Sequence, residues 1–126
     1  MGRKSRVDME AHVLAMLPHV PEDEARELAE VVERLVAAFQ PERVFLFGSW
    51  ARGDATSDSD FDLLIVVPTA TEPNYRLAQK AYGAAGHYSF SLDLLVMPRE
   101  EFEWRSHSVA SLPATVLREG RLLYAA

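Results

Sequence analysis

The sequence predicts a mixed α/β domain in which one covered β-sheet is flanked by helices. Two observations indicate this fold class. Stretches with helical spacing of apolar residues alternate with short runs rich in aromatic and β-branched residues. Proline or glycine closes most of these stretches. Helices that alternate with apolar strands are typical of an α/β or α+β layer fold, although such a pattern does not give the order of the strands.

The first third of the chain predicts two helices and a strand. A short helix is expected over residues 8–17. A clearer helix follows Pro21, because acids fill its first turn and its apolar residues recur every three or four positions until Pro41 stops it. Residues 44–47 are aromatic and β-branched and end at Gly48, so they predict a buried strand.

The middle of the chain predicts two further strands joined by a helix. Residues 61–67 form an apolar run closed by a proline, which is typical of a buried strand. A helical segment is expected over about residues 75–85, before Gly86. Residues 90–97 then form a third apolar run, again closed by a proline.

The last part of the chain predicts two helices, over residues 100–105 and 112–119, with Gly120 at the position of a helix C-cap. Residues 122–124 fit a last short strand. A chain of 126 residues has room for one core, so we expect a single domain over residues 1–126.

Composition excludes several functional classes. The absence of cysteine excludes disulfides, Cys-ligated zinc and a thiolate nucleophile, and the four histidines show no metal-binding cluster. A net charge of −6 argues against a protein that coats nucleic acid. No apolar run approaches the roughly 20 residues of a membrane span. We therefore expect a cytoplasmic protein without membrane or nucleic-acid partners.

Two acids at the start of the second strand are unusual. Side chains in a strand alternate, so Asp60 and Asp62 share a face, with Cα atoms roughly 6.6 Å apart. Carboxylates this close repel one another unless a cation lies between them, and oxygen ligands favour magnesium or manganese. The alternative is a turn or cap feature, which is the interpretation we give to Asp58 in its turn-forming context.

Asp93 interrupts the third apolar strand. A lone buried carboxylate is costly, so a partner is required. If this strand lies beside the second one, Asp93 completes a cluster of three carboxylates able to hold two metal ions for displacement at phosphorus. The alternative partner is an arginine, since 11 of the 13 basic residues are arginines.

The loop from Gly48 to Asp54 suggests an anion site. A Gly-Ser pair at the end of a strand lets backbone N–H groups approach a phosphate, and the hydroxyl of Ser49 adds a donor. Arg52 would either meet a phosphate or pair with a local aspartate. Neither a Walker A loop nor a G-x-S-x-G nucleophile motif is present.

The run Gly48-Ser49, ten residues and then Asp60-Phe61-Asp62 resembles the G-S-x10-D-x-D signature of the DNA polymerase β-like nucleotidyltransferase superfamily. The stretches FGSWARGDATSDSDFDLLIVV, SLDLLV and VLREGRLLY look like the minimal nucleotidyltransferases, the small prokaryotic branch of this superfamily. The resemblance covers roughly residues 23–124. It implies a polymerase β palm-like fold, a mixed sheet flanked by helices.

The resemblance also implies an activity: transfer of a nucleoside monophosphate from ATP or another NTP to a hydroxyl, with two Mg²⁺ ions that Mn²⁺ can replace. Gly48 and Ser49 would contact the terminal phosphates. Asp60 and Asp62 would hold the metals, while Asp93 would bind the catalytic metal and help to deprotonate the acceptor hydroxyl.

The acceptor is less well defined. Stand-alone minimal members are often encoded beside a HEPN-domain toxin, and some act as antitoxins by transferring AMP to a tyrosine of that toxin, which is our leading interpretation. An aminoglycoside-like small-molecule acceptor and a non-catalytic antitoxin acting by occlusion are the alternatives. A homo-oligomer remains open.

Some other side chains have simpler interpretations. Trp50 is a candidate for stacking on the base or for the core, and Lys80 fits a solvated residue better than a phosphate contact. Tyr75, Tyr82 and Tyr88 fit packing better than modification. Two more aromatic residues after the third strand are candidates for an apolar partner surface, namely Phe102 and Trp104.

Overall fold

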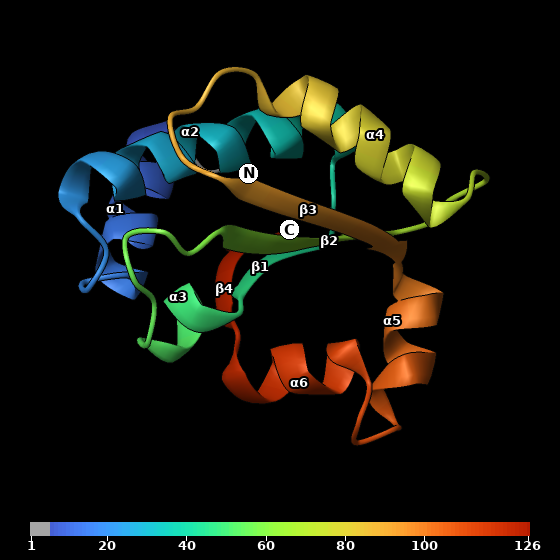
Figure 1. Cartoon of the computed structure of the whole chain (residues 1–126). Coiled ribbons are helices and arrows are strands. Elements are labelled where there is room, and N and C mark those ends of the chain that lie inside the picture. The colour runs from blue at the N-terminus through green and yellow to red at the C-terminus, as the bar shows by residue number, and fades with distance from the viewer. Residues whose placement is uncertain (1–5) are drawn as a thin grey trace.

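A computed structural model describes residues 6–126, with side chains from residue 8 onward. One sheet lies between helices on both faces (Figure 1), which confirms the mixed α/β fold class predicted from the sequence. Helices α1, α2 and α4 cover one face, and α5 and α6 lie against the other (Figure 1). The elements in chain order are α1 (Arg6–Met16), α2 (Glu22–Phe39), β1 (Arg43–Phe47), α3 (Ser49–Arg52), β2 (Phe61–Val67), α4 (Asn74–Ala85), β3 (Leu92–Pro98), α5 (Arg99–Ser106), α6 (Leu112–Glu119) and β4 (Arg121–Ala125).

The strand order, which the sequence did not give, is β3-β2-β1-β4. Strands β2 and β3 are parallel, whereas β1 runs antiparallel to both β2 and β4. A parallel pair needs a crossover connection, and α4 supplies it. Two consequences matter for the site. The acidic starts of β2 and β3 lie side by side, and β3 is an edge strand of the described sheet.

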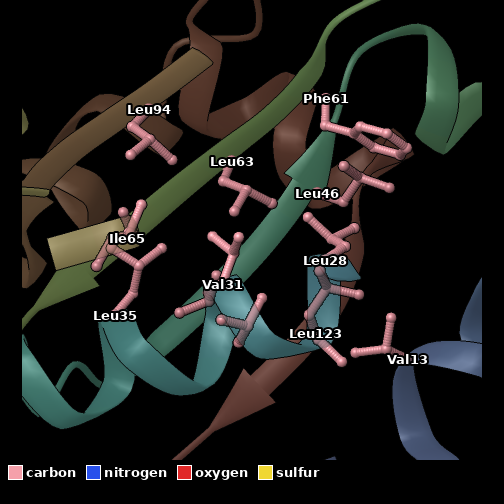
Figure 2. Close-up of a cluster of buried hydrophobic side chains, with 14 of the residues drawn as sticks. Val13, Leu28, Val31, Leu35, Leu46, Phe61, Leu63, Ile65, Leu94 and Leu123 are labelled. Carbon is pink, nitrogen blue, oxygen red and sulfur yellow. The ribbon is translucent and has the colours of Figure 1, made fainter. Parts of the chain in front are cut away.

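The alternation of β2 separates two apolar clusters. Its odd-numbered residues pack against α2, as Figure 2 shows for Leu63 and Ile65, which face Val31 and Leu35. Its even-numbered residues Leu64 and Val66 belong to a smaller cluster beneath α5 and α6. Asp62, two residues before Leu64, therefore points to the α5–α6 side of the sheet.

Most predicted elements are present within two residues of their expected ends. Strand β3 begins at Leu92 rather than at residue 90, because the ring of Phe90 turns inward and packs edge-on against Phe61, 4.7 Å away. The C-cap glycine Gly120 does not adopt the left-handed conformation, since its φ is −74°. It is needed for close packing instead, because a Cβ there would lie 2.5 Å from the carbonyl oxygen of Val116.

The expected aromatic surface after β3 is only partly present. Phe102 is buried and stacks on Phe45 with ring centroids 5.7 Å apart, so its assignment to an exposed surface was wrong. Its position in α5 points it at the sheet, whereas Trp104 is 75% exposed. None of the helices within residues 6–126 is both long and apolar enough to cross a membrane.

Candidate functional site

Two acids meet at the start of the parallel strand pair. Asp62 of β2 is directly in register with Asp93 of β3, so both side chains leave the sheet on the same face. Asp60 immediately precedes β2, two residues before Asp62. The condition set by the sequence, that the two acidic strands be neighbours, is therefore met by the fold.

Gly48 makes room for one of these acids. Strand β1 pairs Phe47 with Asp62, so the residue that follows lies directly beneath the carboxylate. A Cβ built on Gly48 would lie only 2.2 Å from Oδ2 of Asp62. The glycine also has φ +78° and ψ −159°, a conformation essentially restricted to glycine. The glycine of the Gly-Ser pair is thus dictated by both backbone and space.

The carboxylates share one electrostatic field. The pKa of Asp62 rises from its usual 3.8 to about 6, first because the group is partly buried and then because Asp93 and Asp60 repel its charge. Arg52 acts in the opposite direction and lowers the pKa. A cation placed among these oxygens would relieve the repulsion.

Asp93 differs from the sequence prediction in two respects. It is exposed rather than buried, because β3 lies at the edge of the sheet. Its hydrogen-bond partner is a tyrosine rather than an arginine: the Tyr82 hydroxyl donates to Oδ1 of Asp93 over 3.1 Å. The same hydroxyl accepts a hydrogen bond from the N–H of Leu94 at 2.9 Å. The partial burial of the phenol is the main cause that raises the pKa of Tyr82.

Tyr82 was therefore missed as a site residue. The sequence indicated a packing role, yet its hydroxyl lies against the third acid and it is 39% exposed. No local motif distinguishes it from Tyr75 or Tyr88. Only the packing of α4 beside β3 brings it to Asp93.

The donor set fits a hard divalent cation. Asp60, Asp62 and Asp93 offer only carboxylate oxygens, which Mg²⁺ and Mn²⁺ prefer, and burial, together with repulsion from the other two, raises the pKa of Asp62. Within residues 6–126, however, no three or more His, Asp or Glu side chains are arranged so that they could hold an ion without moving. Binding at this site would require the carboxylates to turn towards one another.

The Gly-Ser loop turns directly into the single-turn helix α3. Gly53 ends this turn with φ +89°, and its N–H donates to the carbonyl oxygen of Ser49 at 2.9 Å. Arg52 pairs with Asp54 at 3.2 Å and lies 3.9 Å from Glu119. Of the two roles left open for Arg52, the structure contains the local ion pair, an exposed contact of little strength.

Trp50 belongs to the core. It is 7% exposed and stacks on Phe61, with ring centroids 4.9 Å apart. Its indole N–H donates to the carbonyl oxygen of Ser59 at 3.1 Å, which fixes the backbone just before Asp60. Lys80 is exposed and pairs with Glu72, as expected for a solvated lysine.

The comparisons with known proteins identify the family of the chain. The family model described as a nucleotidyltransferase domain matches residues 25–123. "Putative protein adenylyltransferase MJ0604" of Methanocaldococcus jannaschii is 32% identical over 108 residues, 81% of this chain and 99% of that protein. "Putative protein adenylyltransferase MJ0141" of the same organism is 44% identical over 57 residues, 45% of this chain and 56% of that protein's length.

A solved structure shows the same fold. A crystal structure described as that of a putative nucleotidyltransferase from Sulfolobus solfataricus superposes with a TM-score of 0.50 and 24% identity, covering 82% of this chain and 84% of that one. At this identity the likeness concerns the fold alone. Because the family model spans most of the sequence, the nucleotidyltransferase class predicted from the motifs is confirmed: the chain belongs to the nucleotidyltransferase domain family.

Proposed function

We propose that the chain transfers a nucleoside monophosphate, AMP in our leading interpretation, from an NTP to a hydroxyl group of a protein. The observation that supports this most directly is the in-register pair Asp62 and Asp93, with the carboxylate of Asp62 seated over Gly48. This places two acids from parallel strands beside the Gly-Ser corner. That is the arrangement expected if one site must hold both a triphosphate and an attacking hydroxyl.

In this proposal Asp60, Asp62 and Asp93 would hold two Mg²⁺ ions. When bound, the ions would neutralise charge on the triphosphate, lower the pKa of the acceptor hydroxyl and stabilise the departing pyrophosphate. Gly48 and Ser49 contact the terminal phosphates. Arg52 reaches a phosphate only by leaving its exposed pair with Asp54, which costs little.

The transfer balances without a further reactant. The acceptor oxygen forms a bond to the α-phosphorus, and the bond from that phosphorus to the bridging oxygen of pyrophosphate breaks. Pyrophosphate leaves with the bonding electron pair. Asp93 takes the hydroxyl proton, and its exposure at the sheet edge leaves it accessible to a large acceptor.

The choice of acceptor is supported by similarity. Both curated relatives carry the name protein adenylyltransferase, which favours AMP as the group and a protein as the acceptor. The resemblance to minimal nucleotidyltransferases adds a specific partner, a HEPN-domain toxin. This chain would act as its antitoxin by transferring AMP to a tyrosine of the toxin. A small-molecule acceptor has no comparable support among these relatives.

The test is transfer of label from ATP labelled at the α-phosphate, with Mg²⁺ and a HEPN protein encoded beside this chain. We expect label on the HEPN protein and a loss of at least about 100-fold in Asp62→Asn or Asp93→Asn. Asp58→Asn is the matched control, because Asp58 is an exposed acid of the turn before β2. If both site variants still silence the toxin without labelling it, occlusion rather than catalysis is the function.

A further inference from the structure

A groove crosses the open edge of β3 and leads towards Asp93. It has a volume of about 470 Å³ and lies between α4 on one side and α5 and α6 on the other. We propose that this groove binds an extended segment of the acceptor protein and so brings the hydroxyl to Asp93. The inference rests on the proposed function and names how its substrate is held.

The floor of the groove is a strand edge with free hydrogen-bonding capacity. The carbonyl oxygen of Ser91 accepts a hydrogen bond from the N–H of Phe61, so the backbone groups of Ser91 point towards β2. The N–H of Leu94, by contrast, points away from β2 and donates to the hydroxyl of Tyr82. Backbone groups alternate in direction along a strand. The N–H and C=O of Val96 therefore also point outward, into the groove that Val96 helps to line. An added extended segment can pair with such an edge.

The dimensions of the groove suit a short segment. Its α4 wall runs from Asn74 to Tyr82, and the eight helical rises between these residues span about 12 Å. This equals roughly four residues of extended chain. At the Asn74 end, Glu101 accepts hydrogen bonds from the side chains of Asn74 and Arg105, at 2.9 Å and 3.1 Å. At the other end, Tyr82 lies against Asp93, so a segment in the groove leads to the catalytic acid.

The lining predicts the chemistry of the segment. Between its polar ends the groove is mainly apolar, with Tyr75, Ala78, Leu95 and Leu112 around it. Leu95 and Asp93 project on the same face of β3, two residues apart. A segment whose hydroxyl reaches Asp93 would therefore place an apolar side chain near Leu95, two or three positions from the hydroxyl-bearing residue.

The proposal is tested with a peptide array in which each peptide of twelve residues has one central tyrosine and varied neighbours. We expect labelling from ATP to require an apolar residue within three positions of the tyrosine. Ala78→Trp fills the groove and should lower kcat/KM for the labelled peptides at least tenfold. Arg76→Trp places the same side chain on an exposed position of α4 outside the groove lining and should change kcat/KM less than twofold.

Binding is measured separately from transfer by hydrogen exchange in Asp62→Asn with the pooled peptides. We expect the Val96 amide to exchange at least tenfold more slowly when peptides are bound. Protection without transfer by the unaltered chain would overturn the proposed function and keep the groove. If Ala78→Trp does not fold, Tyr75→Ala replaces it, since Tyr75 is 64% exposed, and should lower kcat/KM at least threefold.

Three results would overturn the groove. The first is a kcat/KM of Ala78→Trp equal to that of Arg76→Trp. If Ala78→Trp does not fold, Tyr75→Ala takes its place in this comparison. The second is a Val96 amide whose exchange the peptides do not slow. This result would overturn the groove even if an intact folded acceptor is labelled. The third is a monomer–dimer equilibrium that Ala78→Trp abolishes, which would assign the groove to a second copy of this chain.

Discussion

Replacing Gly48 with alanine should separate the proposed catalytic role of the Gly-Ser corner from its structural one. The new Cβ would lie 2.2 Å from Oδ2 of Asp62, well inside van der Waals contact, and the backbone would be held at φ +78°. The strained backbone costs about 2 kcal/mol and the overpacked contact with Asp62 costs about 1 kcal/mol more. Displacing Asp62 from its partly buried position beside Asp60 and Asp93 relieves repulsion and so restores about 1 kcal/mol of unfolding free energy after solvent screening. The net loss of unfolding free energy is then about 2 kcal/mol.

Gly53→Ala is the matched control. Gly53 also has a positive φ, +89°, but a Cβ there meets nothing within 4 Å. Its cost should be the conformational one alone, about 1 kcal/mol. For a domain of this length about 1 kcal/mol corresponds to a shift of roughly 3–5 °C in Tm. We therefore expect Tm to fall by roughly 6–10 °C in Gly48→Ala and roughly 3–5 °C in Gly53→Ala.

Thermal unfolding followed by circular dichroism gives the two Tm values, and transfer of label from ATP gives the activity well below either of them. Gly48→Ala should lose nearly all transfer because Asp62 is displaced from the other acids. Gly53→Ala should keep most of it. Equal activity in the two variants, or full activity in Gly48→Ala, would refute the view that Asp62 must sit directly over Gly48.

Three further predictions concern stability. Because the pKa of Asp62 is about 6 in the folded chain, above its usual 3.8, the folded state holds a proton that the unfolded state has released between these pH values. The stability that this group contributes is therefore lost as pH rises from about 4 to about 6. In denaturant titrations, Asp62→Asn should be more stable than the unaltered chain by about 1 kcal/mol at pH 7 and equally stable below pH 4. A less stable variant at pH 7 would contradict the electrostatics. Millimolar Mn²⁺ with ATP should raise Tm relative to EDTA in the unaltered chain but not in Asp62→Asn, because ligand at 100-fold excess over Kd adds about 2.7 kcal/mol to the unfolding free energy; identical melting curves would count against the metal site. Gly83→Ala, in the interior of α4 with open space around the new methyl group, should stabilise the fold by about 0.5–1 kcal/mol, and a loss of stability in calorimetry would show that α4 is strained there.

Local patterns predicted the elements well where one physical signal dominated. The bounds of β2 and α6 follow the sequence prediction because a proline closes the apolar run of β2 and a glycine follows the last residue of α6. The start of β3 was placed two residues early. Phe90 has strong strand propensity, yet its ring is used in packing against Phe61 and not in extending the sheet.

The candidate site shows the same division. Asp60, Asp62 and the Gly-Ser pair are close in sequence, and the resemblance of their spacing to the G-S-x10-D-x-D family signature indicated that they act together. Asp93 was linked to them only through the condition that its strand be a neighbour. Its exposure was not foreseen, because apolar neighbours in the sequence imply burial on both faces and say nothing about the edge of a sheet.

The sequence by itself indicated the candidate site residues: a Gly-Ser pair that follows a strand, and carboxylates placed in strands where nothing in packing calls for charge. It also determined the elements that hold them, since periodicity and turn residues are local properties of the chain. The tertiary structure alone decided the strand order and the register of Asp62 with Asp93. It also placed Tyr82 against that acid and formed the groove along β3. These features depend on contacts between residues far apart in the chain, and the free energy of such contacts leaves no periodic trace in the sequence.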